Sequence, residues 1–198
     1  MQNKTGSRDI DAAFAVMTGT LLLGVVLGVM CYCFMSEDAA RIISAAQSDY
    51  IGFRQSADFA QILLASFGVS TLFLTALFLL GFFAFGQLPA LFVLMYRGSG
   101  LGMILSQAYS GADGSRGALT VLMIVPACVI SCYALCICAK ESVRMSGRLL
   151  RHMMFNKPFP GMLESVKNYA VRFAALEAVA AVSAACDCIC SVLLADRI

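Results

Sequence analysis

Five long apolar runs alternate with shorter polar stretches along the chain. The runs extend over residues 12–35, 62–85, 88–109, 117–139 and 169–194. A helix needs about 20 apolar residues to cross the hydrocarbon core of a bilayer, and each run is long enough. Because the runs occupy most of the 198 residues, we expect a single all-α integral membrane domain over residues 1–198, built as a bundle of about five transmembrane helices.

The third run differs from the others in the polarity of its middle. Arg97 is followed by Gly98, Gly100 and Gly102, which indicates either a helix break or a close contact with another helix. Non-helical backbone at mid-membrane is tolerated only where protein or a wet cavity surrounds it. We therefore predict that the third helix is broken at this glycine-rich segment, and that the run lies at the centre of the bundle or re-enters the membrane.

Small residues recur at four-residue spacing in three of the runs. They are Thr20, Gly24 and Gly28, then Gly98 and Gly102, and finally Ala170, Ala174 and Ala178. Such stripes let helix backbones approach closely. We expect these contacts within one chain, with a homo-oligomer as the alternative.

The polar stretch over residues 140–168 carries six lysines and arginines between Lys140 and Lys167. Basic residues next to transmembrane helices stay on the cytoplasmic side. With this loop and the N-terminus inside, the inside segments hold eight Lys or Arg and the outside segments hold four. The bias predicts a cytoplasmic N-terminus, an outside loop over residues 36–61 and an outside C-terminus. Within the basic loop, charges at 140, 144, 148 and 151 predict one helical face, suited to anionic lipid headgroups.

The outside loop carries apolar side chains at nearly helical spacing among its charges. One interpretation is a solvated connector, and the other is a helix that lies at the membrane surface or binds a partner. For the second we single out Glu37, Asp38, Tyr50 and Phe53.

Composition narrows the possible functions. The chain is 60% apolar and 13% charged, with a net charge of +2. So small a net positive charge gives no reason to expect nucleic-acid binding. Its nine cysteines lie in the predicted spans, where we expect reduced, apolar side chains rather than disulfides or metal ligands. We find no catalytic or cofactor-binding motif, and we expect no enzyme activity, no cofactor and no metal.

Ionisable groups inside hydrocarbon are costly and therefore call for a partner or a function. Counted from the inner ends of their runs, Arg97, Ser131 and Glu177 lie at nearly the same depth. We predict a buried polar layer in which Arg97 pairs with Glu177, serving either helix register or a conduction path. Asp187 lies nearer the outside, without an obvious partner.

Four short motifs in order along the chain resemble the stage II sporulation protein M family of bacterial membrane proteins. They are Gly86-Gln87-Leu88-Pro89, Arg97-Gly98 with Gly102, Pro126 in the fourth run, and Asp187 in the last. The resemblance implies a non-enzymatic component of the engulfment machinery in endospore formation. Such a component lies in the septal membrane and holds peptidoglycan hydrolases outside.

Two readings of function follow. The first is an anchor or scaffold that contacts membrane lipids and recruits extracytoplasmic peptidoglycan hydrolases through the outside loop. The alternative is a small channel, transporter or lipid-moving protein in which the intramembrane polar layer lines a route.

Overall fold

A computed structural model describes residues 3–110, 114–155 and 162–194, which form six helices and no strand. The helices are α1 (Asn3–Cys33), α2 (Glu37–Ser56), α3 (Phe59–Leu80), α4 (Gln87–Ser110), α5 (Gly114–Phe155) and α6 (Met162–Leu194). All except α2 contain a segment long and apolar enough to cross a membrane. The predicted all-helical membrane fold with five spans is therefore confirmed.

The helix boundaries follow from local sequence. Helix α2 has Glu37 and Asp38 in its first turn, where negative charge is favoured by the helix dipole. Helix α3 begins with a capping box between Asp58 and Gln61. Helix α4 has Pro89 in its first turn, where no intrahelical donor is lost.

Three helices extend well beyond the predicted runs, and α3 ends earlier than predicted. Helix α1 begins at Asn3 rather than at residue 12. Helix α5 continues past residue 139 to Phe155, so the basic segment 140–154 is helical as predicted. Helix α6 begins at Met162 rather than at residue 169, while α3 ends at Leu80 rather than at residue 85. Residues 156–161 of the predicted basic loop and residues 195–198 at the C-terminus lie outside the described part of the chain.

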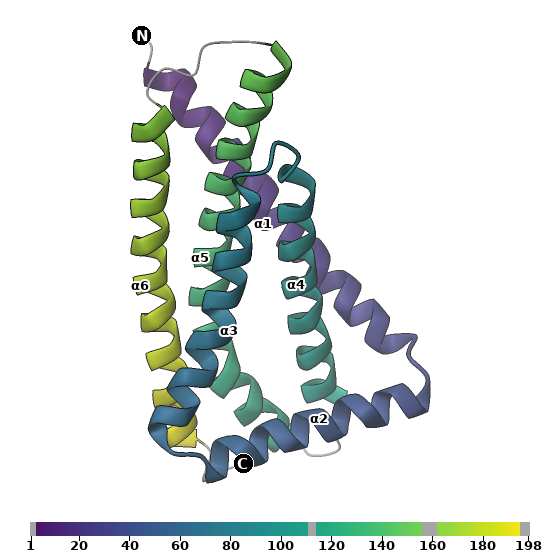
Figure 1. Cartoon of the computed structure of the whole chain (residues 1–198). Coiled ribbons are helices and arrows are strands. Elements are labelled where there is room, and N and C mark those ends of the chain that lie inside the picture. Colours follow the sequence, from purple (N-terminus) through teal and green to yellow (C-terminus); the bar gives the residue numbers. More distant parts are fainter. Residues whose placement is uncertain (1–2, 111–113, 156–161, 195–198) are drawn as a thin grey trace.

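Helix α2 lies crosswise over one end of the bundle, which also contains the ends of α4 and α6 (Figure 1). The start of α1, the turn between α3 and α4 and the basic end of α5 lie together at the opposite end. The segments predicted to lie on one side of the membrane therefore lie together at one end of the bundle. Helix α5 contacts α1, α3, α4 and α6, so it is the central helix.

Helix α4 is continuous, and the predicted break at its glycine-rich segment is wrong. Gly98 and Gly102 face α1, where a Cβ at either position would collide with the carbonyl oxygens of Leu21 and Val25. On α1, Gly24 and Gly28 meet the α4 backbone in the same way. The glycines therefore allow a close contact between two helices, which was the alternative to a helix break. Gly100 points away from this seam, with open space around it.

The buried apolar core occupies the half of the bundle farther from α2. Four leucines there are almost fully buried: Leu74, Leu77, Leu94 and Leu135. Beside them Tyr169 stacks on Phe78 with ring centroids 5.2 Å apart, and its hydroxyl donates to the Phe78 carbonyl at 3.0 Å. We call this the core half, and the half next to α2 the cavity half.

Candidate functional site

The inner face of α2 covers the cavity half. Ile43, Ala46, Tyr50, Phe53 and Arg54 recur at helical spacing on this face and line a cavity beneath it. The outer face is mostly polar, with exposed Glu37, Asp38, Arg41, Ser48 and Asp49, and Ile42 is exposed beside them. Residues Glu37–Ser56 are therefore helical, while contact of this helix with a partner or with the membrane surface stays a prediction.

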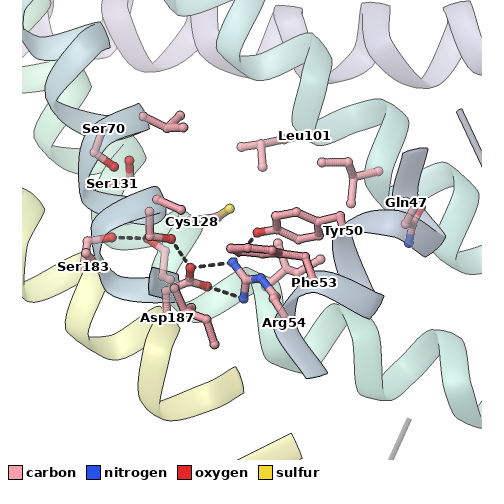
Figure 2. A pocket seen from close by; sticks show the side chains of 18 of the residues that line it. Gln47, Tyr50, Phe53, Arg54, Ser70, Leu101, Cys128, Ser131, Ser183 and Asp187 are labelled. Carbon is pink, nitrogen blue, oxygen red and sulfur yellow. Dashed lines mark hydrogen bonds and ion pairs between the residues drawn. The ribbon is translucent and has the colours of Figure 1, made fainter. Parts of the chain in front are cut away.

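Arg54 of α2 and Asp187 of α6 form a buried, bidentate ion pair. The Arg54 Nη1 donates to Asp187 Oδ1 at 2.9 Å, and Nη2 donates to Oδ2 at 2.5 Å. Only 6% of Arg54 and 5% of Asp187 is exposed. This pair, which we call the clamp, joins the C-terminal part of α2 to the bundle (Figure 2).

Three hydroxyl groups complete the hydrogen bonding of the clamp. Arg54 also donates to Ser191 Oγ at 2.6 Å and to the Tyr50 hydroxyl, while Ser66 of α3 donates to Asp187. The Tyr50 ring lies against the guanidinium, with 4.4 Å from Arg54 Cζ to the ring centroid. Burial lowers the pKa of Arg54, but the hydrogen bonds and electrostatic interactions with Asp187 and Tyr50 together leave this pKa raised. Removing one partner of such a hydrogen-bonded, buried ion pair leaves the other charge alone and strongly destabilises the protein.

The clamp corrects the expectation that Asp187 has no obvious partner. The sequence placed Arg54 in an outside loop, and only the return of α2 over the bundle brings it to α6. One signal was present: Arg54 falls on the same face of the helix as Ile43, Gln47 and Tyr50. An arginine on the apolar face of an amphipathic helix calls for a buried acidic partner.

A cavity of about 420 Å³ lies between α2 and the ends of α3, α4, α5 and α6. Apolar side chains form most of its wall. Its polar side chains, besides those of the clamp and its hydroxyl partners, are Gln47, Ser70, Arg97, Gln107, Ser131 and Ser183. Figure 2 shows Tyr50, Cys128, Ser131 and the clamp around this space. Its volume falls within the roughly 300–1,000 Å³ of small-molecule sites.

Arg97 lines the cavity. The predicted ion pair between Arg97 and Glu177 is wrong. Its guanidinium lies over the Phe73 ring, with 5.6 Å from Cζ to the centroid, and its buried Nε has no hydrogen-bond partner. Glu177 instead accepts a hydrogen bond from Thr71 Oγ1 at 3.0 Å. Depth alone predicted the pair, but α3 and α5 both contact α4 and α6 and lie between them.

The other predicted site residues fall in three places. Ser131 is buried in the cavity wall, in the same cavity as Arg97 and Asp187 but apart from Glu177. Tyr50 and Phe53 face the cavity, whereas Glu37 and Asp38 are exposed at the start of α2. Pro126 lies inside the continuous helix α5 next to Ala127 of the wall. Gln47 and Gln107 also line the cavity but were not predicted, because nothing in the sequence distinguishes them from other glutamines.

The cavity wall carries few acidic or metal-ligating side chains. Within residues 3–110, 114–155 and 162–194, no group of three His, Cys, Asp or Glu side chains is placed to hold a metal ion, and the nine cysteines are free thiols. The one carboxylate in the cavity wall is neutralised by Arg54. The lining therefore carries two arginines and one aspartate, a net charge of +1. Comparisons of the chain with protein-family models, with curated proteins and with solved structures find no match.

Proposed function

We propose that the chain is a non-enzymatic membrane scaffold that recruits peptidoglycan hydrolases to the septal membrane during engulfment in endospore formation. The observation that carries this proposal is the position of α2, which the clamp holds across one end of the bundle. The order of the four sequence motifs, which resembles the stage II sporulation protein M family, supplies the process and the class of partner.

The charge pattern assigns α2 to the outside of the membrane. The opposite end of the bundle carries Lys140, Arg144, Arg148 and Arg151 on the extension of α5, and such clusters remain cytoplasmic. The N-terminus is then cytoplasmic, and α2 faces the cell wall. That is the side on which a wall hydrolase is held.

The outer face of α2 has the chemistry of a docking surface for a basic partner. Glu37, Asp38 and Asp49 are exposed there, against Arg41 as the basic residue of that face. Complementary charge steers partners together and sets their orientation. A helix fixed by a buried ion pair presents this pattern in one orientation, so less ordering is needed when the partner binds.

Co-purification from spore-forming cells tests the proposal. The full chain, tagged at its N-terminus, is crosslinked during engulfment and purified, and the bound proteins are identified by mass spectrometry. We expect wall hydrolases with the wild type and a loss of most of them with Glu37→Lys combined with Asp38→Lys. The matched control is Glu164→Lys, which reverses an exposed charge in the first turn of α6 at the opposite end. Equal recovery from all three proteins, or no hydrolase with the wild type, would refute the scaffold.

A further inference from the structure

Arg97 has no acidic side chain within ion-pair distance among the residues that the structure describes. Arg54 pairs with Asp187, and both Arg144 and Arg172 pair with Glu141. Among the described residues, Arg97 makes no such pair, and its contact is the face of the Phe73 ring. It lies near the middle of a helix that is apolar enough to span the membrane. An uncompensated cation at this depth, in the wall of a cavity, favours an anion inside that cavity.

The cavity wall contains further unsatisfied groups. The buried Nε of Arg97 and the Oε1 atoms of Gln47 and Gln107 have no hydrogen-bond partner, and all three residues line the cavity. Buried polar atoms in folded proteins are nearly always paired with protein, water or ligand. Gln107 lies ten residues after Arg97 on α4, about 15 Å along the helix axis. The unsatisfied groups therefore extend from the middle of the bundle to the level of α2.

A second cavity, of about 220 Å³, adjoins the first and has an entirely apolar lining. It lies between α1, α4 and α5. Leu101, Ile104, Ile124 and Cys128 line both cavities. Leu101 is one helical turn from Arg97 on the same face of α4, so the shared wall begins next to the unpaired charge.

We propose that these two cavities bind one anionic amphiphile per chain, with its carboxylate or phosphate at Arg97 and its apolar chain in the second cavity. An arginine side chain suits this role because its planar guanidinium donates to both oxygens of such a group. A free inorganic anion leaves the apolar cavity empty and loses its hydration against a mostly apolar wall. A cation finds no free carboxylate, because Asp187 is held by Arg54. The site does not depend on the proposed scaffold function.

Calorimetric titration of the full chain, delipidated in a neutral detergent, tests the site with three probes. Oleate supplies both the anion and the chain, oleyl alcohol the chain alone, and inorganic phosphate the anion alone. We expect oleate to bind at one per chain and at least ten times more tightly than oleyl alcohol, with no binding of phosphate. Tight binding or competition by phosphate would assign the site to a free anion and overturn the proposal. Equal affinity for oleate and oleyl alcohol would also overturn it.

Variants then locate the two parts of the ligand. Arg97→Gln is expected to weaken oleate binding by about 10- to 100-fold, the loss that accompanies removal of a hydrogen bond to a charged group. Arg172→Gln is the matched control, because Arg172 is an exposed arginine of α6 paired with Glu141 outside the cavity. It should bind oleate like the wild type. Unchanged oleate affinity in Arg97→Gln would refute the placement of the anion.

A third variant tests the chain end without touching Arg97. Leu101→Phe adds bulk to the wall shared by the two cavities. It should weaken the binding of oleate about tenfold while leaving that of hexanoate, a short chain with the same carboxylate, within about twofold. Equal losses for both acids would contradict the placement of the chain in the second cavity. Helical circular dichroism and thermal unfolding confirm that each variant is folded.

Discussion

The two halves of this bundle are built from the same helices, but they are packed differently. In the core half, Leu74, Leu77, Leu94 and Leu135 are almost fully buried, and Phe78, Tyr169 and Phe173 pack ring against ring. The cavity half instead encloses spaces of about 420 and 220 Å³ and places two arginines beside them. Empty interior space loses dispersion contacts and is unfavourable. The contrast indicates that the core half supplies the tighter packing, and it is consistent with the ligand site that we propose in the cavity half.

Polar groups also differ between the two halves. In the core half, the Tyr169 hydroxyl bonds to the carbonyl oxygens at the end of α3, and Ser146 bonds to the Ala84 carbonyl. These contacts join α5 and α6 to the end of α3 and the turn that follows it. In the cavity half, the clamp is satisfied, but Arg97, Gln47 and Gln107 keep unpaired atoms. Buried atoms without a hydrogen-bond partner therefore occur in both halves, since Thr18 and Ser142 beside the core also have one.

The largest expected effect comes from breaking the clamp. Arg54→Leu or Asp187→Leu leaves the other charge buried and unpaired, which costs about 3–5 kcal/mol. Thermal unfolding of each single variant in detergent should show a large fall in Tm. The double variant Arg54→Leu with Asp187→Leu should recover much of this loss, because no charge is then left alone. Additive losses in the double variant would show that the two residues are not coupled.

Truncation of leucines should separate the two halves directly. Leu77→Ala removes a side chain that is 0% exposed in the core, and such changes cost about 2–5 kcal/mol. Leu101→Ala enlarges a cavity that already exists, so its effect on Tm should be clearly smaller. Equal losses of stability would contradict the division into a packed and a hollow half.

The close contact between α1 and α4 should not tolerate a larger side chain at Gly98 or Gly102. Gly98→Leu places side-chain atoms against the backbone of α1, and overpacking costs about 1–3 kcal/mol. Gly100→Leu is the matched control on the same helix, since a Cβ there meets nothing within 4 Å. We expect a lower Tm for Gly98→Leu and a nearly unchanged one for Gly100→Leu. The same loss at both positions would indicate a general effect of leucine in this helix.

The smallest effect is expected from Arg97→Leu, and its sign is informative. An Arg97–Glu177 pair would make this variant unstable, whereas the observed Arg97 has no acidic partner to lose. We therefore expect an equal or slightly higher Tm in ligand-free protein, because a costly charge is removed from the membrane interior. A marked fall in Tm would show that Arg97 stabilises the bundle.

Hydropathy predicted the spans well because membrane crossing constrains length and polarity in every helix. The spacing of the basic residues at 140, 144, 148 and 151 predicted the helical continuation beyond residue 139. Small residues at four-residue spacing indicated close contacts, and two of the three stripes form one between α1 and α4. The third stripe is exposed on α6, at Ala170, Ala174 and Ala178. The predicted helix break failed because glycine permits both a break and a close approach, and sequence alone does not tell which neighbour is present.

The sequence did not predict which helices lie next to one another in the bundle. Depth along the helices put Arg97 and Glu177 at one level, yet α3 and α5 separate them. The clamp requires α2 to return over the bundle, and this depends on tertiary packing rather than on its own sequence. The two cavities, of which the larger has unpaired polar groups in its wall, likewise arise from the way in which the helices meet.

Hydrogen–deuterium exchange of α2 in lipid nanodiscs tests the central claim most directly. If the clamp holds α2 on the bundle, its amides should exchange slowly in the wild type. In Asp187→Asn they should exchange much faster, while the core half of α3 and α6 stays protected. Fast exchange of α2 in the wild type, or the same protection in both proteins, would contradict the account.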